Sequence, residues 1–287
     1  MYRHIPKKSL GQNFLKSEAA LTKIRDAANP SANDVILEIG PGLGALTKIL
    51  LTFAGKVIAV EKDDQLYETL GNLFAAERAS GKLDLIHGDI LEFDPEVLRA
   101  YDNGLLAVYK LVANIPYNIT GAIIEKFLAA SFQPSDVVIL VQKEVAERII
   151  ARDGKESILS IAVKAYGTPR YVATVKAGSF TPAPKVDSAI VAIENISRSH
   201  FTNKHHEEVF FQLVKAGFAH KRKMLAGNLK NILEPDLVTR ILQENHLPAT
   251  VRAEDVGIST WLSMATMVYT DQYGFGTTNE LETLSSL

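Results

Sequence analysis

The residues best suited to chemistry are Asn114-Ile115-Pro116-Tyr117, which follow the apolar run YKLVA. The exocyclic amine of a nucleobase is a poor nucleophile because its lone pair is delocalised into the ring. The side-chain oxygen of Asn114 and a neighbouring backbone carbonyl could accept both amine hydrogens and aim the nitrogen at an electrophilic carbon. Pro116 would stiffen the loop, and the ring of Tyr117 could stack on the base. The same four residues could also form a proline turn beside a buried tyrosine, so their position in the fold decides between the two interpretations.

Three glycines, Gly40, Gly42 and Gly44, lie between the apolar run VILEI and the helical pattern ALTKILL. Glycines at such a strand-to-helix turn let a ligand approach the backbone. Glu61 ends the next apolar run, where a carboxylate could accept hydrogen bonds from both ribose hydroxyls of a nucleoside. This pattern predicts a nucleoside cofactor, although it does not distinguish a nicotinamide dinucleotide from S-adenosylmethionine, and a tight packing turn would look similar.

Asp89, in the segment HGDILEFD, follows a third apolar run. Its carboxylate could accept a hydrogen bond from an adenine amino group, although a lone Asp is commonly a turn or helix-cap residue. Because ligands of open α/β sheets bind at the carboxyl ends of the strands, we expect Gly40, Glu61, Asp89 and Asn114 to converge there. The occurrence of Asn114-Ile115-Pro116-Tyr117 after the other three residues favours a methyltransferase over a dehydrogenase. A dehydrogenase is also disfavoured because no acid/base pair for hydride transfer is apparent.

The elements that would position these residues are apolar, β-rich runs alternating with helical patterns. This alternation predicts an α/β fold, a Rossmann-like domain with a mostly parallel sheet, over residues 1–200, with hairpin-like strands near 160–194. Residues 201–273 have helical periodicity and predict a small all-helical domain. Residues 274–287 are polar and rich in Gly, Thr and Ser, so we expect a disordered tail.

Composition excludes several classes of function. The chain has no cysteine, which excludes disulfides, thiolate zinc sites and cysteine nucleophiles, and the adjacent His205 and His206 point to different sides of a helix, so no metal site is predicted. The net charge is −2, yet residues 1–25 and 204–230 are basic and could meet phosphate. No apolar stretch approaches the length of a membrane span, so we expect a cytoplasmic protein.

Seven motifs together resemble the ribosomal RNA adenine dimethyltransferases that act on the small subunit. They are LGQNFL (10–15), LEIGPGLGALT (37–47), VEKD (60–63), HGDIL (87–91), NIPYNIT (114–120), VQKEVAERI (141–149) and FTPAPKVDSA (180–189). The resemblance implies S-adenosylmethionine as cofactor, with Asn13 and Leu15 helping to cover it. It implies a pocket completed by Gly40, Glu61, Asp89, Ile90 and Asn114.

The same resemblance implies that Asn114 and Tyr117 are catalytic and that Phe180 faces Tyr117 across a flipped target base. Read from its residues alone, the Phe180 loop could equally be anchored in the core. In the helical domain Lys221, Arg222 and Lys223 would contact RNA phosphates. Two further candidates for RNA contact are Lys143 and Arg148. This chain departs from its relatives in two places. Relatives usually carry Gly and Leu where this chain has Ala113 and Ile115. They also commonly carry a Tyr-Gly dipeptide after the QKEVA motif, and the segment ARDGKESILS of this chain lacks it.

The implied partner is ribosomal RNA in the small ribosomal subunit or its assembly intermediate, bound by a monomer. Two alternatives stay open beside the dehydrogenase. One is the large-subunit adenine methyltransferase that confers macrolide resistance, which shares several motifs. The other is a ribosome assembly factor in which methylation is incidental.

Overall fold

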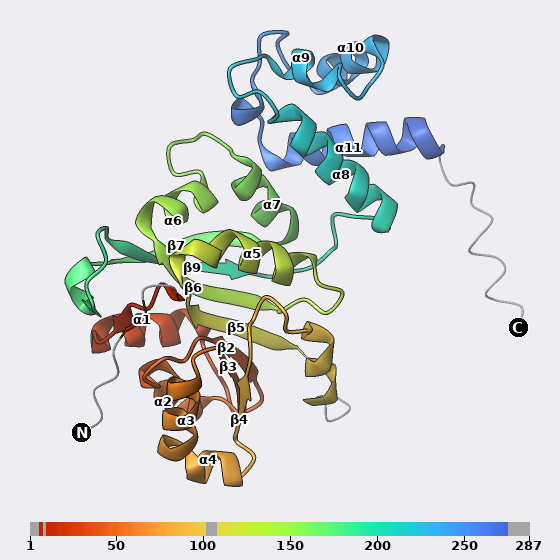
Figure 1. The fold of residues 1–287 in the computed structure, drawn as a ribbon. Helices are drawn as coiled ribbons and strands as arrows, with labels where there is room; N and C mark the ends of the chain where they lie inside the picture. The colour runs from red at the N-terminus through yellow and green to blue at the C-terminus, as the bar shows by residue number, and fades with distance from the viewer. Residues whose placement is uncertain (1–5, 8–9, 102–107, 275–287) are drawn as a thin grey trace, which may run out of the picture. The chain divides into compact units, whose positions relative to one another are not determined.

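The computed structural model describes residues 6–7, 10–101 and 108–274 of the chain. The chain divides into two compact units (Figure 1), one made of residues 1–150 and 166–197 and the other of residues 151–165 and 198–287. Residues 151–165 thus pack with the helical unit, although they lie inside the range 1–200 expected for the first domain. The tail expected at 274–287 lies, apart from Gly274, outside the described residues.

A seven-stranded sheet forms the centre of the first unit. Its strands are β2 (Val35–Ile39), β3 (Lys56–Glu61), β4 (Leu83–His87), β5 (Tyr109–Asn114), β6 (Asp136–Gln142), β7 (Thr168–Val175) and β9 (Ser188–Glu194). The order across the sheet is β4-β3-β2-β5-β6-β9-β7. The first five strands are parallel, and β9 runs antiparallel to both β6 and β7. The chain therefore reverses its direction of travel across the sheet between β2 and β5, which is where open α/β sheets bind ligands.

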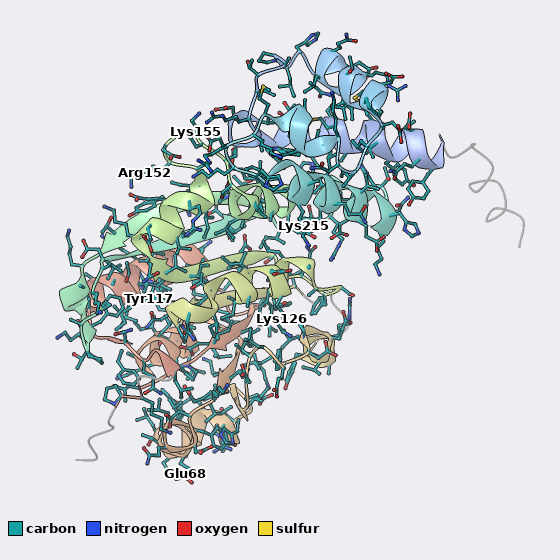
Figure 2. The ribbon with its side chains drawn as sticks, turned by 45° about the horizontal axis from the view of Figure 1, so that its top comes forward. Glu68, Tyr117, Lys126, Arg152, Lys155 and Lys215 are labelled. Carbon is teal, nitrogen blue, oxygen red and sulfur yellow. The ribbon has the colours of Figure 1, made fainter. Side chains whose placement is uncertain are left out.

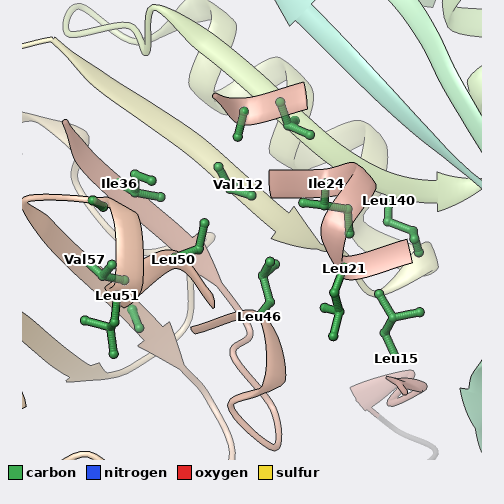
Figure 3. Packing of buried hydrophobic residues seen from close by; sticks show 14 of the residues in the cluster. Leu15, Leu21, Ile24, Ile36, Leu46, Leu50, Leu51, Val57, Val112 and Leu140 are labelled. Atoms are coloured by element: carbon green, nitrogen blue, oxygen red, sulfur yellow. The ribbon is translucent and has the colours of Figure 1, made fainter. Parts of the chain in front are cut away.

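Helices cover both faces of this sheet, which is why its central strands β2, β3, β5 and β6 consist mainly of buried residues. The helices of the first unit are α1 (Glu18–Ala28), α2 (Ala45–Phe53), α3 (Asp64–Leu73), α4 (Ala75–Ala79), α5 (Thr120–Ala129) and α6 (Lys143–Ile150). Side chains of α1 and α2 pack on one face (Figure 3), around Leu21, Ile24, Leu46, Leu50, Ile36, Val57, Val112 and Leu140. Buried residues at the alternate strand positions, such as Leu37 and Leu111, point to the opposite face.

A small second sheet pairs two distant segments of the first unit. In it β1 (Phe14–Leu15) runs antiparallel to β8 (Phe180–Thr181), with Leu15 opposite Phe180. The backbone N–H of Lys16 also donates to the carbonyl of Ser179 at 2.9 Å. This pairing ties the N-terminal segment to the loop that carries Phe180.

The second unit is helical, as the periodicity after residue 200 predicts. It contains α8 (Lys204–Gly217), α9 (Leu225–Leu229), α10 (Pro235–Glu244), α11 (Ile258–Tyr273) and all but the last residue of α7 (Ile158–Tyr166). Their shared core includes Phe210, Leu213, Val214, Leu229, Ile241 and Trp261. The hairpin expected near 160–194 is correct for β7 and β9 but wrong for residues 160–166, which belong to α7. Ile161 and Ala165 lie one helical turn apart and are both buried in this core, so a helical arrangement satisfies the run ILSIAVKAY.

Among the residues that the structure describes, none of the helices has the length and apolar character needed to cross a membrane.

Candidate cofactor and base-binding site

Four of the expected site residues gather at one edge of the sheet. Gly40 directly follows β2, Glu61 and Asn114 end β3 and β5, and Asp89 follows β4 by two residues. The strands are parallel neighbours whose ends are level, because Ile39 of β2 pairs with both Val60 and Ala113. Gly40 is therefore flanked by Glu61 on one side and Asn114 on the other. The convergence of these residues is predicted by the sequence, whereas their order across the sheet is not.

The glycine turn after β2 leaves room beside its backbone. Gly40 and Gly42 have φ of +62° and +60°, the left-handed region in which a side chain is strained. A Cβ at Gly40 would have no atom within 4 Å, so open space lies beside this residue. A Cβ at Gly42 would lie 3.1 Å from Cδ1 of Phe14, so the ring of Phe14 rests on the turn.

Glu61 is a buried carboxylate held by backbone donors. Its Oε2 accepts from the N–H of Gly42 at 3.1 Å and its Oε1 from the N–H of Asp63 at 2.8 Å. Burial raises the pKa of the Glu61 carboxyl, and these hydrogen bonds oppose that rise. The backbone N–H of Lys62 is a further donor to this carboxylate, and the lone pairs that remain could accept from ribose hydroxyls.

Asp89 has the turn role that its sequence context allowed, and its second carboxylate oxygen pairs with a lysine. Its Oδ1 accepts from the N–H of Leu91 at 2.9 Å, as a turn residue would. Its Oδ2 lies 2.6 Å from Nζ of Lys62, and this ammonium lowers the pKa of the carboxyl. Asp89 is thus ionised and able to accept a further hydrogen bond. The adjacent Ile90 is buried and can contribute an apolar wall.

The side-chain amide of Asn114 is oriented by the N-terminal segment. Its Nδ2 donates to the carbonyl of Asn13 at 3.1 Å. The oxygen Oδ1 can therefore accept a hydrogen bond from a bound ligand. Asn13 is itself held by a bond from its Nδ2 to the carbonyl of Gly11. The expected cofactor-covering residue Asn13 and the expected catalytic residue Asn114 are therefore in direct contact.

Tyr117 begins the short turn that follows Pro116, and its hydroxyl lies 2.6 Å from Oγ of Ser188 on β9. Burial raises the pKa of the Tyr117 phenol, which is half-buried on the loop after β5 and is labelled in Figure 2. Ser188 belongs to the segment that sequence reasoning selected for Phe180, but its own role has no signal in the sequence.

The ring of Phe180 lies deeper in the protein than an aromatic side chain that is open to stacking on a base. Only 2% of its surface is exposed, and it belongs to the core cluster with Leu15 and Val175. This placement matches the core-anchored alternative that its sequence allowed. Stacking of Phe180 on a base stays a prediction, and it requires that the base enter beside a ring that is packed in this conformation.

A group of residues that sequence reasoning missed fastens the N-terminal segment to the sheet edge. Asp63, whose side chain is fully buried, lies 3.0 Å from Nζ of Lys7 and accepts from Nε2 of Gln12 at 3.0 Å. Its other oxygen caps α3 by accepting from the N–H groups of Gln65 and Leu66. An Asp directly before a helical run is a recognisable N-cap signal, but the contacts to residues 7 and 12 leave no sequence trace.

Glu38, on β2 two residues before Gly40, is a further buried acid at this edge. Burial raises its pKa to about 8, and its Oε2 has no hydrogen-bond partner. The unpartnered oxygen of Glu38, the open space at Gly40 and the carboxylates of Glu61 and Asp89 form a set of acceptors that fits a nucleoside cofactor with a cationic group.

The expected RNA-binding residues are distributed over both units. Lys221, Arg222 and Lys223 are exposed in the turn between α8 and α9 of the second unit. This turn is braced by Asn228, whose Nδ2 donates to the carbonyls of Gly217 and His220. Lys143 and Arg148 lie on α6 of the first unit, where Arg148 is exposed and Lys143 is 3.8 Å from Glu147.

Comparisons with known proteins agree with this arrangement. The ribosomal RNA adenine dimethylase family matches residues 3–269. A ribosomal RNA small subunit methyltransferase A of Dehalococcoides mccartyi (strain CBDB1) is 41% identical over 257 residues, which cover 89% of this chain and 86% of the relative. A crystal structure of a dimethyladenosine transferase from Plasmodium falciparum has a TM-score of 0.72 at 26% identity and covers 90% of this chain and 98% of that one.

The fold is also shared with the 23S rRNA methyltransferase ErmE, whose crystal structure has a TM-score of 0.73 at 23% identity over 89% of this chain and 99% of that one. The α/β fold with its Rossmann-like sheet is thereby confirmed. With a family match over most of its length and a relative at 41% identity, the chain belongs to the ribosomal RNA adenine dimethylase family.

Proposed function

We propose that this protein transfers methyl groups from S-adenosylmethionine to the exocyclic amines of two adjacent adenosines near the 3′ end of small-subunit ribosomal RNA, in connection with assembly of that subunit. The observation that carries the proposal is the level register of β3, β2 and β5, which sets Glu61, Gly40 and Asn114 side by side. The residues that would bind the nucleoside of the cofactor, Glu61 and Gly40, therefore lie next to Asn114, whose amide would orient the target amine. The names of the relatives favour the small subunit over the large one.

The chain's own residues would hold the cofactor, which supplies a methyl group on a sulfonium. Gly40 and Gly42 let it approach the backbone, and Glu61 accepts from its ribose hydroxyls. Asp89 accepts from its adenine amine beside Ile90. The N-terminal segment covers it through Asn13 and Leu15. The cofactor-binding residues that we propose are Asn13, Leu15, Gly40, Gly42, Glu61, Asp89, Ile90 and Asn114.

Asn114 would orient the nucleophile. With Nδ2 committed to the carbonyl of Asn13, the side chain presents Oδ1 to one amine hydrogen of the target adenine, and a backbone carbonyl of the same loop accepts the other. These bonds favour a more pyramidal nitrogen and aim its lone pair. The methylated nitrogen carries an acidic proton that water removes, so no strong base is needed. Stacking between Tyr117 and Phe180 would hold the extruded base.

The partner would be the small ribosomal subunit or an assembly intermediate. Lys221, Arg222 and Lys223 would contact phosphates and position the RNA without reading its sequence, aided by Lys143 and Arg148. The proposed catalytic and cofactor-binding residues need no second copy of the chain, which is compatible with a monomer, and a ribosomal substrate favours action in the cytoplasm.

The test is transfer of labelled methyl from S-adenosylmethionine to small subunits, large subunits and free ribosomal RNAs that lack dimethyladenosine, followed by nucleoside mass analysis. Dimethyladenosine in the small subunit is expected. Label in large-subunit RNA alone would instead identify the resistance-type activity, and cofactor binding without any transfer would leave an assembly factor. The variant Asn114→Ala should lose turnover while keeping its affinity for the subunit, and wild-type activity in that variant would contradict the mechanism.

A further inference from the structure

The hydroxyl group of Ser188 is held in a fixed position by the sheet. Ser188 is the first residue of β9 and is fully buried. Its backbone pairs with Gln142 of β6 on one side and Val175 of β7 on the other. A side chain on a strand that is paired on both sides has little freedom to shift, so Oγ of Ser188 is a rigid anchor.

Tyr117 is tethered to this anchor from 71 residues away in the sequence. At its backbone end, Pro116 and the hydrogen bond from the N–H of Ile115 to the carbonyl of Leu140 fix the loop. At its other end, the hydroxyl lies 2.6 Å from Oγ of Ser188. Because the hydroxyl lies on the long axis of the ring, this bond fixes where that axis points and keeps the side chain from swinging to another rotamer.

The residue before Ser188 restrains the other aromatic loop. Oδ1 of Asp187 accepts from the N–H of Ala177 at 3.1 Å, and Oδ2 lies 2.8 Å from Nζ of Lys176. These contacts hold the start of the segment that leads to Phe180. The dipeptide Asp187-Ser188 therefore restrains both of the loops that carry the rings of the proposed base clamp.

We propose that Ser188 is a positioning residue for methyl transfer, which holds the ring of Tyr117 where the target adenine must stack for its amine to reach Oδ1 of Asn114. This inference rests on the proposed function. A small displacement of a bound base costs far more rate than affinity, because the reacting atoms must be aligned while the RNA is held mainly by phosphate contacts. Loss of the bond should thus slow transfer and leave binding of the subunit nearly unchanged.

The experiment is a double-mutant cycle with Ser188→Ala and Tyr117→Phe, measured as single-turnover methyl transfer to undermethylated small subunits. Tyr117→Phe keeps the stacking ring and removes only the hydroxyl. Each single variant should slow transfer by roughly tenfold, the upper end for loss of one hydrogen bond, and the double variant should be no slower than either. Ser188→Thr, which keeps a hydroxyl, should restore most of the rate.

Ser160→Ala is the matched control, because Ser160 is also fully buried and hydrogen-bonded but lies in the helical unit. It should lower thermal stability without changing the rate of transfer. Multiplicative effects of the two single variants, or a Ser188→Ala rate equal to that of the wild type, would overturn the inference. So would an equal loss of S-adenosylhomocysteine binding, which would indicate a general structural role. Absence of transfer by the wild type would instead refute the proposed function itself.

Discussion

Asp63 provides a test of whether the N-terminal segment is held over the cofactor by a buried carboxylate. Asp63→Ala removes the N-cap of α3, a loss of about 1 kcal/mol. It also removes the charge-assisted interactions with Lys7 and Gln12, which would be worth about 1.5–3 kcal/mol each if buried but less here, because Lys7 is 40% exposed. The expected loss in free energy of unfolding is about 2–4 kcal/mol.

Asp63→Asn separates the two contributions, because Asn is as good an N-cap as Asp but carries no charge. It should cost about 1–2 kcal/mol, because the oxygen that accepts from both Lys7 and Gln12 becomes an amide nitrogen. Both variants should bind S-adenosylmethionine several-fold more weakly, since Gln12 and its neighbour Asn13 lose their tether. The assays are urea unfolding and calorimetric titration of the cofactor.

The neighbouring Asp64→Ala is the control, because that side chain is 80% exposed and pairs with His87 at the surface. It should change stability by less than about 1 kcal/mol and leave cofactor affinity unchanged. An Asp63→Ala variant that unfolds and binds like the Asp64→Ala variant would refute the reasoning.

Burial opposes ionisation of Asp63, but the hydrogen bonds from Lys7, Gln12 and Leu66 outweigh this effect and lower the pKa of the carboxyl. The contribution of Asp63 to stability should therefore disappear as the pH falls through that lowered pKa.

Three further predictions use other parts of the chain. For Glu38, whose pKa is raised by burial from 4.5 to about 8, the folded state binds the proton more tightly than the unfolded state, so stability should fall as the pH rises across that interval. Glu38→Gln should lose this dependence, so unfolding at pH 5.5 and pH 8 should show the variant gaining on the wild type by about 1.4 kcal/mol for each pKa unit titrated. Gly217→Ala would place a Cβ against Cη2 of Trp261 and should lower the melting temperature by several degrees. Gly227→Ala is the control, because no atom lies near its Cβ, and it should leave the melting temperature unchanged. Equal melting temperatures of the two variants would contradict the packing of Gly217 on Trp261. Replacing Lys221, Arg222 and Lys223 by Ala should flatten the dependence of log Kd for RNA on log salt by about 1 for each phosphate that is no longer neutralised, and an unchanged slope in filter binding would remove this turn from the RNA-binding surface.

The sequence was sufficient to predict that Gly40, Glu61 and Asn114 meet at one end of the sheet, because each follows or ends an apolar run that is visible in the sequence. β-branched runs end in Gly40, Glu61 and Asn114, and the parallel register that aligns them follows from alternation of strands and helices. The helical unit was predictable for the same reason, since Phe210, Leu213 and Val214 repeat with helical spacing.

The parts that were not predicted depend on interactions between distant residues. Tyr117 and Ser188 are 71 residues apart, and Gln12 and Asp63 are 51 apart, so no periodic pattern connects them. β1 is only two residues long, too short to show alternation. The run at 160–166 was misassigned because a short apolar stretch satisfies a strand as well as a helix, and only packing on the helical core decides between them.

Because residues 151–165 pack with the helices after residue 197, the helical unit is discontinuous in the sequence. The chain passes between the units at residues 150/151, 165/166 and 197/198 rather than once. A fragment that ends at residue 200 would therefore keep α7 but lose the core that buries Ile161 and Ala165. Chimaeras in which this chain receives the C-terminal segment of a relative near residue 200 would join α7 of one parent to the helical core of the other. Chimaeras of this chain should therefore fold only when residues 151–165 are inherited together with the helices after residue 197.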